Sequence, residues 1–256
     1  MRSYLRELFF RNWYWYISKI DRKSEVLLMN FGYHDPNHPI ELSEDDNKDR
    51  FSTQLYHQLV SRVDVSGKSI CEIGSGRGGG LAYVHKRFKP ASSVGIDLNR
   101  RAVNFCNSYY RLPGMRFLQG NAHAIPLEKE TLDFVLNVES SHRYDHFNVF
   151  LSQVYRVLKK EGYLLLTDFR YAYDMEAMKS DIDASGLEIL HYEEINYQVI
   201  NALKADDARR KDLVKRLIPG VLRKTAKSFA GAVGSETYNM FADGRYVYFV
   251  YILRKV

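Results

Sequence analysis

The sequence predicts an α/β fold with a doubly wound, Rossmann-like sheet of seven strands. Apolar segments of strand length alternate with helical patterns along most of the chain. One of them, 69–73, runs directly into five glycines between Gly74 and Gly80. Another, 92–98, carries Asp97 near its end, 21 residues after Gly76. An acid at that separation is typical of the tip of the second strand in nucleotide-binding sheets.

The N-terminal elements follow from the spacing of apolar residues. Residues 1–23 form an amphipathic pattern with an aromatic end, which would either cap the active site or rest on a membrane surface. A polar loop with aromatic residues follows up to position 49. Helical recurrence then alternates with strands, and Pro90 ends one of the helices. The predicted elements are a helix over 50–63, a strand over 69–73, a helix over 81–88, a strand over 92–98, a helix over 99–109 and a strand over 115–119.

The C-terminal half continues the alternation and then departs from it. A loop and the central fourth strand occupy 126–138, and the β-prone run 246–253 closes the sheet. Between them the sequence predicts a helix over 145–158, a turn over 159–162, a strand over 163–169, a helix over 174–184, a strand over 187–195 and an insertion over 198–243. An insertion at the strand ends is normally a lid or a substrate wall. The predicted units are an N-terminal helical cap (1–48), the core (49–197), the lid insertion (198–243) and the closing strand (244–256).

Composition limits the class of protein. The two cysteines give neither a disulfide scaffold nor a metal site, and no segment approaches the length of a membrane span, so we expect a soluble cytoplasmic protein without a metal. The net charge of +6 is concentrated in Leu203–Lys227, which holds nine Lys or Arg and three Asp. This stripe indicates either a solvated helix face or an anionic partner, including peripheral contact with a membrane.

The glycine cluster predicts a floor for a nucleotide-like ligand, because glycine lets a ligand lie against bare backbone. Gly74, Gly76 and Gly79 match the dinucleotide pattern, so a nicotinamide-dependent oxidoreductase is one alternative. Glu72 argues against it, since a carboxylate there would lie near a pyrophosphate. It suits a cofactor that carries an amino group and no phosphate.

The run Glu72-x-Gly74-x-Gly76-x-Gly78 resembles motif I of class I S-adenosylmethionine (SAM) methyltransferases. The resemblance implies that Glu72 faces the cofactor's ammonium group, that Asp97 accepts from the ribose hydroxyls, and that Asn121 and the Ala122 N–H contact the adenine. It differs at Asn121, where the family more often has Asp. The cofactor-binding residues implied are Tyr33, Glu72, Gly74, Gly76, Asp97, Leu98, Asn121, Ala122 and Asn137.

Two further segments resemble a group of sterol, tocopherol and phthiotriol-type lipid methyltransferases. Residues 28–36 are similar to the group's "MNYGYW" segment, whose tyrosine reaches over the cofactor, and Tyr33 is the matching position. His34 and Asp35 follow it where the group often has Trp. Glu139-Ser-Ser-His142 is similar to a segment after the fourth strand in which a carboxylate and a histidine border the acceptor.

These resemblances imply methyl transfer by in-line displacement to a hydroxyl of a hydrophobic or aromatic small molecule, such as a lipid or polyketide. His142 is the candidate general base, because a histidine titrates near neutral pH. Glu139 suits either acid–base chemistry or a cationic intermediate, so C-methylation of a sterol- or prenyl-like acceptor stays open. Abundant aromatic residues, 19 Tyr and 14 Phe, suit an apolar acceptor, and no nucleic-acid-binding motif is present.

Overall fold

The computed structural model describes residues 24–256, so the helix predicted over 1–23 and its membrane contact lie outside the described residues and stay predictions. Seven strands form one sheet in the order β3-β2-β1-β4-β5-β7-β6. The first five strands pair in parallel, and β7 runs antiparallel to both β5 and β6. This is the doubly wound arrangement that the sequence predicts, with the order reversing beside β1. The strands are β1 (Ser69–Ile73), β2 (Ser92–Asp97), β3 (Met115–Gln119), β4 (Leu132–Val138), β5 (Leu158–Tyr171), β6 (Leu187–Glu194) and β7 (Tyr246–Lys255).

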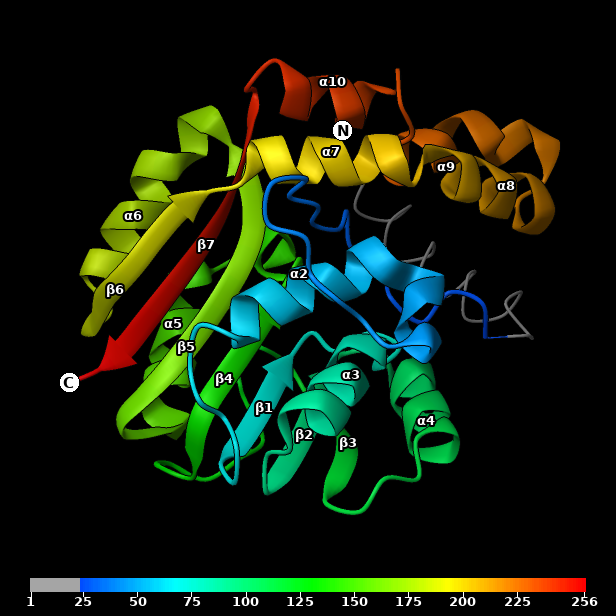
Figure 1. Cartoon of the computed structure of the whole chain (residues 1–256). Helices are drawn as coiled ribbons and strands as arrows, with labels where there is room; N and C mark the ends of the chain where they lie inside the picture. The colour runs from blue at the N-terminus through cyan, green and yellow to red at the C-terminus, as the bar shows by residue number, and fades with distance from the viewer. Residues whose placement is uncertain (1–23) are drawn as a thin grey trace.

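Helices cover both faces of the sheet (Figure 1). Side chains of α2, α3, α7 and α10 belong to one apolar cluster, and those of α5 and α6 belong to another. The α-helices among the described residues are α2 (Arg50–Val60), α3 (Gly79–Phe88), α4 (Arg100–Tyr109), α5 (Phe147–Val157), α6 (Met175–Asp183), α7 (Asn196–Ala205), α8 (Asp207–Leu217), α9 (Arg223–Phe229) and α10 (Glu236–Ala242). The 3₁₀ turns are η1 (Glu44–Asp49), η2 (Ser141–Arg143), η3 (Ala172–Asp174) and η4 (Gly220–Leu222).

The closing strand β7 is apolar along its length because both faces of the sheet are buried there. Successive side chains of a strand point to opposite faces. In β7 the side chains of Tyr248, Val250 and Ile252 enter the cluster under α2 and α7, whereas their neighbours in sequence enter the cluster under α5 and α6. A continuous apolar run is therefore required here, where a half-exposed strand would alternate with polar residues.

Most predicted elements lie within a few residues of the observed ones, and two regions differ more. The segment 159–162, predicted as a turn, continues β5 with Glu161 at φ 62°, because the Leu132–Leu158 pair extends the β4–β5 ladder across a bulge. The insertion is also not a single unit. Its α7 and α10 pack into the core, whereas α8 and α9 share a small apolar cluster of their own. No helix in the region 24–256 is long and apolar enough to cross a bilayer.

Gly80 at the start of α3 gives a test of the packing. An added Cβ would lie 1.9 Å from Cζ of Tyr56, a buried ring of α2. We expect Gly80→Ala to destabilise the fold by about 2 kcal/mol, measured by urea unfolding, because overpacking displaces the ring. Gly220→Ala is the matched control, since a Cβ there meets no atom of residues 24–256 within 4 Å. Equal midpoints for the two variants would contradict this packing.

Candidate active site

A cavity of about 2150 Å³ lies at the carboxyl ends of the parallel strands. The ends of β1, β2 and β4 line one part of it, as expected at the crevice of a doubly wound sheet. The segment 25–31 and the α8–α9 pair line the opposite part. Its volume exceeds the roughly 300–1,000 Å³ of an ordinary ligand pocket, so two ligands fit side by side.

The glycine loop presents bare backbone to this cavity. Among the described residues, a Cβ added to Gly76 would meet within 4 Å only the methyl group of Met29, at 3.6 Å. Asp97 at the tip of β2 fixes the loop, because its carboxylate accepts from the N–H groups of Gly76 and Asn99, both at 2.8 Å. Burial raises the pKa of Asp97, and the two N–H donors oppose that rise. Asp97 and Gly76 both line the cavity.

Beyond β3, a short turn forms the next part of the wall. Asn121 accepts the backbone N–H of His123 with its Oδ1 at 2.9 Å, which fixes the orientation of its amide. Ala122 lines the cavity beside it, and Leu98 extends from the tip of β2 with 66% of its surface exposed. The turn and the tip of β2 thus hold three of the predicted cofactor residues along one edge.

Glu72 does not lie where the sequence predicts it. The residue is 1% exposed and does not line the cavity; its Oε1 accepts from the hydroxyl of Tyr56 at 2.6 Å. Its Oε2 has no hydrogen-bond partner in the part of the chain that the structure describes. Tyr56 does line the cavity, so its ring separates the carboxylate from a ligand. Desolvation raises the pKa of Glu72 to about 7. Glu72 thus lies behind Tyr56 in this structure, and its contact with the ammonium group of the cofactor stays a prediction.

Two other predicted cofactor residues also lie away from the cavity. Tyr33 packs in the core near Glu193, and its backbone N–H bonds the carbonyl of Phe51. Asn137 is fully buried and donates from Nδ2 to the carbonyl of Ile73 at 2.9 Å and to Tyr144. Neither residue lines the cavity. Tyr33 lies elsewhere because the loop after Asn30 turns its side chain into the core, and Asn137 joins the ends of β1 and β4.

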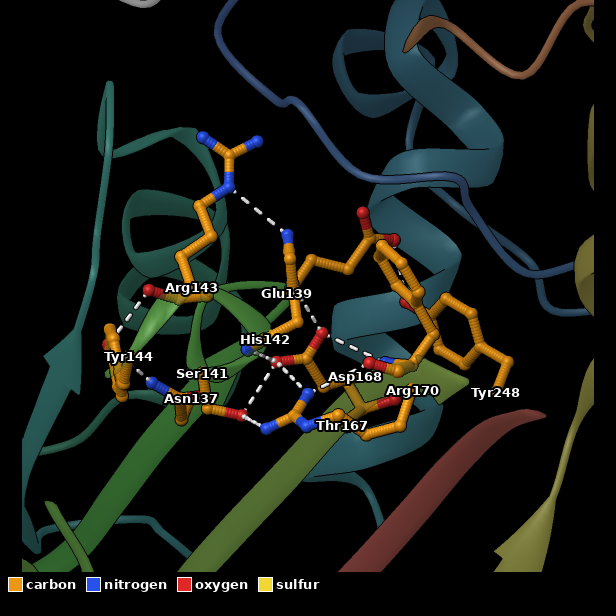
Figure 2. A network of polar contacts seen from close by, with 12 residues as sticks. Asn137, Glu139, Ser141, His142, Arg143, Tyr144, Thr167, Asp168, Arg170 and Tyr248 are labelled. Atoms are coloured by element: carbon orange, nitrogen blue, oxygen red, sulfur yellow. Dashed lines mark hydrogen bonds and ion pairs between the residues drawn. The ribbon is translucent and has the colours of Figure 1, made fainter. Parts of the chain in front are cut away.

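His142 lies at the end of β4 and faces a carboxylate that the sequence analysis did not assign. Its Nδ1 is 2.7 Å from Oδ1 of Asp168 on β5, and 17% of the His142 side chain is exposed, toward the cavity (Figure 2). A buried carboxylate beside Nδ1 holds the proton there and leaves Nε2 as the acceptor. Desolvation lowers the pKa of His142, and Asp168 opposes that change. The ring is therefore neutral at physiological pH.

Asp168 is fully buried and is satisfied by several donors. The Ser141 hydroxyl and the His142 backbone N–H donate to its Oδ2 at 2.7 and 2.9 Å, and Arg170 lies 3.4 Å from the same oxygen. Burial alone would raise the pKa of Asp168, but His142 and Arg170 hold it well below its usual range. The carboxylate remains ionised, so it orients His142 at every physiological pH.

Arg143 places a cation on the other side of the imidazole. Its Nε donates to Nε2 of His142 at 3.1 Å, and its guanidinium lies 5.8 Å from the ring of Phe229 at the end of α9. Figure 2 shows His142 between Arg143 and Asp168. Arg143 is exposed, lines the cavity and lowers the pKa of Asp97. It thus lies between the Asp97 side of the cavity and the His142 side.

Glu139, the second predicted catalytic residue, lines the cavity and also fixes the structure around it. Its Oε1 accepts from the Tyr248 hydroxyl and from the Phe31 backbone N–H, both at 2.6 Å. Desolvation raises the pKa of Glu139 to about 8. The residue has φ 44°, a conformation that L residues rarely adopt, where β4 bends toward the cavity.

Sequence reasoning missed Tyr56, Arg143, Asp168 and Tyr248. A signal existed for Asp168, because β5 neighbours β4 and an acid at its carboxyl end falls at the same edge of the sheet as His142. No comparable signal existed for Tyr56 or Tyr248. Their hydroxyls reach Glu72 and Glu139 only because α2 and β7 pack against these strand ends.

Comparison with known proteins shows the family to which the chain belongs. Residues 71–166 match the model of a methyltransferase domain. A fatty-acid O-methyltransferase of Mycolicibacterium smegmatis is 38% identical over 220 residues, covering 86% of this chain and 80% of the relative. The chain belongs to the SAM-dependent methyltransferases. This methyltransferase is also 34% identical to the phthiotriol/phenolphthiotriol dimycocerosates methyltransferase of Mycobacterium tuberculosis, covering 96% of this chain and 91% of that one.

Solved structures of low identity share the fold. The geranyl diphosphate C-methyltransferase of Streptomyces coelicolor gives a TM-score of 0.69 at 16% identity and covers 93% of this methyltransferase and 95% of its own chain. The cyclase SpnF gives 0.68 at 19%, covering 89% and 87%. At such identities only the fold is shared. The family assignment replaces the nicotinamide alternative that the glycine pattern left open.

SAM, the cofactor of the family, fits the cavity. The backbone of Gly76, which carries no Cβ, and the carboxylate of Asp97 form a surface on which the cofactor could lie. Leu98, Asn121 and Ala122 line the adjoining edge. These residues would hold the adenosine part, as the sequence predicts, with Asp97 as the acceptor for hydroxyl groups.

The buried Glu72 gives a pH test. When folding raises the pKa of a carboxyl group, the group does not lower the free energy of unfolding at a pH below its unfolded pKa. For Glu72, the free energy of unfolding falls as the pH rises from about 5 through the folded pKa of about 7. We expect Glu72→Gln to remove this part of the fall, on the order of 2 kcal/mol at pH 8, in urea unfolding measured from pH 5 to 8. Glu176→Gln on the surface of α6 should keep the wild-type profile; a Glu72→Gln profile parallel to wild type would contradict the assignment.

Proposed function

We propose that this methyltransferase transfers the methyl group of SAM to an oxygen of a lipid-type acceptor, with His142 as the general base. The names of its relatives, a fatty-acid O-methyltransferase and a phthiotriol dimycocerosates methyltransferase, support a lipid acceptor. The observation that carries the proposal is the Asp168–His142 pair at the cavity wall, with Nε2 as the acceptor atom.

The wall opposite the strand ends supports an apolar acceptor. The α8–α9 pair and the adjoining residues present apolar side chains to the cavity beside basic ones such as Arg210, Lys224 and Lys227. The larger apolar side chains are those of Leu213, Val214, Leu217, Ile218, Phe229 and Met240. Phe169 lies 4.4 Å from His142, centroid to centroid, and continues this surface to the proposed base. Burying a hydrocarbon chain there contributes roughly 0.8 kcal/mol for each CH₂.

The chemistry follows from the protonation states of the site. SAM, when bound, supplies an electrophilic methyl group on its sulfonium. The Nε2 of neutral His142 takes the proton of an acceptor hydroxyl as its oxygen is alkylated, and ionised Asp168 stabilises the resulting imidazolium. Arg143 must move off Nε2 before a hydroxyl can bind there, since it donates to the same lone pair. The aromatic wall excludes water from the reacting oxygen.

A carboxylate acceptor is the second candidate, and Arg143 favours it. A guanidinium beside His142 suits an acceptor carboxylate, which it binds with two parallel N–H groups. Such an oxygen is already a nucleophile, so no base is required. The two candidates therefore predict different effects of removing His142: a large loss of rate with a hydroxyl acceptor and little change with a carboxylate acceptor.

Methylation of carbon is less well supported. A carboxylate that steadies a carbocation must be ionised, whereas desolvation raises the pKa of Glu139 to about 8 and leaves it largely protonated at neutral pH. Glu139 is also held by Tyr248 and by the backbone of Phe31. These contacts favour a structural and electrostatic role beside the acceptor oxygen.

A matched pair of acceptors tests the proposal. With oleyl alcohol and labelled SAM, we expect His142→Gln to lower kcat by about 10²–10⁴, and Asp168→Asn to lower it by a similar order. The wild-type rate should fall on acidification below about pH 6.5, since burial places the pKa of His142 below that value. With oleic acid both variants should stay near the wild-type rate. Full activity of His142→Gln on the alcohol would remove His142 as the base.

Cofactor binding tests the Asp97 assignment separately. We expect Asp97→Asn to weaken the binding of SAM at least about tenfold, measured by calorimetry. The lost carboxylate would accept from the ligand's hydroxyl groups, and it also fixes the glycine loop by accepting from the Gly76 N–H. Asp64→Asn is the control, since Asp64 only caps the turn before β1 by accepting from the Ser66 N–H. Unchanged SAM affinity in Asp97→Asn would argue against this cofactor site.

A further inference from the structure

The basic stripe of the sequence is used in part inside the molecule. Three arginines of α8 contact residues of the segment 25–49. Arg209 lies 2.6 Å from Asp49, Arg216 lies 2.5 Å from Glu25, and Arg210 donates to the carbonyl groups of Asn30 and Phe31. The helix therefore does not present all of its positive charge to solvent or to an anionic partner.

Arg210 is the buried member of this row. The residue is 8% exposed, and its guanidinium donates to four acceptors. Nη2 reaches the carbonyl oxygens of Asn30 at 3.1 Å and Phe31 at 3.0 Å, Nη1 reaches that of Ala230 at 3.0 Å, and Nε reaches Asp206 Oδ2 at 2.9 Å. Desolvating an arginine is costly unless its donors are satisfied, and here the fork matches carbonyl groups from two chain segments.

A chain of contacts joins Arg210 to the part of the cavity where Glu139 and His142 lie. Phe31 accepts from Arg210 with its carbonyl and donates its N–H to Glu139. Its ring packs 5.5 Å from that of Phe169, which in turn packs against His142. One residue of the N-terminal segment thus joins the α8–α9 pair to the end of β4.

Among the described residues, few apolar contacts hold α8 and α9 against the core, and the ion pairs of Arg209 and Arg216 act beside Arg210. The helices' own buried apolar cluster consists of Val214, Ile218 and Ala226, with Val26 packed beside it. This is far smaller than the clusters under the sheet. Because few apolar contacts cross this boundary among the described residues, polar contacts decide whether the pair stays closed.

We propose that Arg210 is a positioning residue that holds α8 and α9 closed on the segment 30–31 and so completes the acceptor wall. The proposal rests on the proposed function, in that the acceptor lies beneath this pair. The residues that would hold the cofactor lie at the ends of β1 and β2 and in the turn after β3, and Arg210 hydrogen-bonds none of them. Loss of Arg210 therefore raises the acceptor KM and leaves the SAM Kd unchanged.

The test compares Arg210→Lys with Lys215→Met in the full chain. Lysine keeps the charge and loses the fork that reaches both carbonyl segments. Lys215 is exposed on the same helix, and its backbone carbonyl accepts from Arg223. For Arg210→Lys we expect the KM for oleyl alcohol or oleic acid to rise about tenfold, and the amides of 207–230 to exchange hydrogen about tenfold faster. Lys215→Met should match wild type in both.

Calorimetry with SAM separates this effect from loss of the fold. An unchanged SAM Kd together with faster exchange in 207–230 supports the proposal, even if neither acceptor is turned over by the wild-type enzyme. Exchange at the wild-type rate would overturn it, as would a parallel loss of SAM affinity and faster exchange throughout the sheet. Failure of the acceptor assay alone would count against the proposed function and not against the closing role of Arg210.

Discussion

The active end of the sheet depends on the burial of one ionised carboxylate. Asp168 lies at the end of β5 with no exposed surface, and an isolated charge there would be unstable by many kcal/mol. Donors from Ser141, His142 and Arg170 compensate it. Because the compensation comes from the turn after β4, the turn and the strand must keep one relative position. The orientation of the imidazole is a consequence of that constraint.

The neighbouring acids show what happens with fewer donors. Glu72 and Glu139 lie at or near the ends of β1 and β4, and each receives the hydroxyl of a buried tyrosine. No cation pairs with either at hydrogen-bond distance among the described residues, and the pKa of each rises, to about 7 and about 8. Three carboxyl groups at one edge of a sheet therefore differ in charge at neutral pH. The difference follows from whether an arginine and a histidine lie within reach.

The sequence was informative where function depends on local pattern. The glycine turn, Asp97 and His142 follow strands whose ends share one edge, so their proximity can be read from the topology. It was uninformative where packing decides direction. Tyr33 matches a family position, yet its ring lies in the core, and Glu72 lies behind Tyr56 because α2 covers β1. The Asp168–His142 pair joins residues 26 positions apart and depends on the register Val138–Thr167 between β4 and β5.

The division of the insertion between β6 and β7 has a consequence for how such enzymes diversify. Helices α7 and α10 are built into the interior, whereas α8 and α9 meet it chiefly through polar side chains and a few apolar ones. Mutations in α8 and α9 can therefore reshape the space offered to a substrate at little risk to folding. Relatives can therefore differ in this pair of helices while they keep the same sheet. Their substrate range can change faster than the residues at the carboxyl ends of the strands.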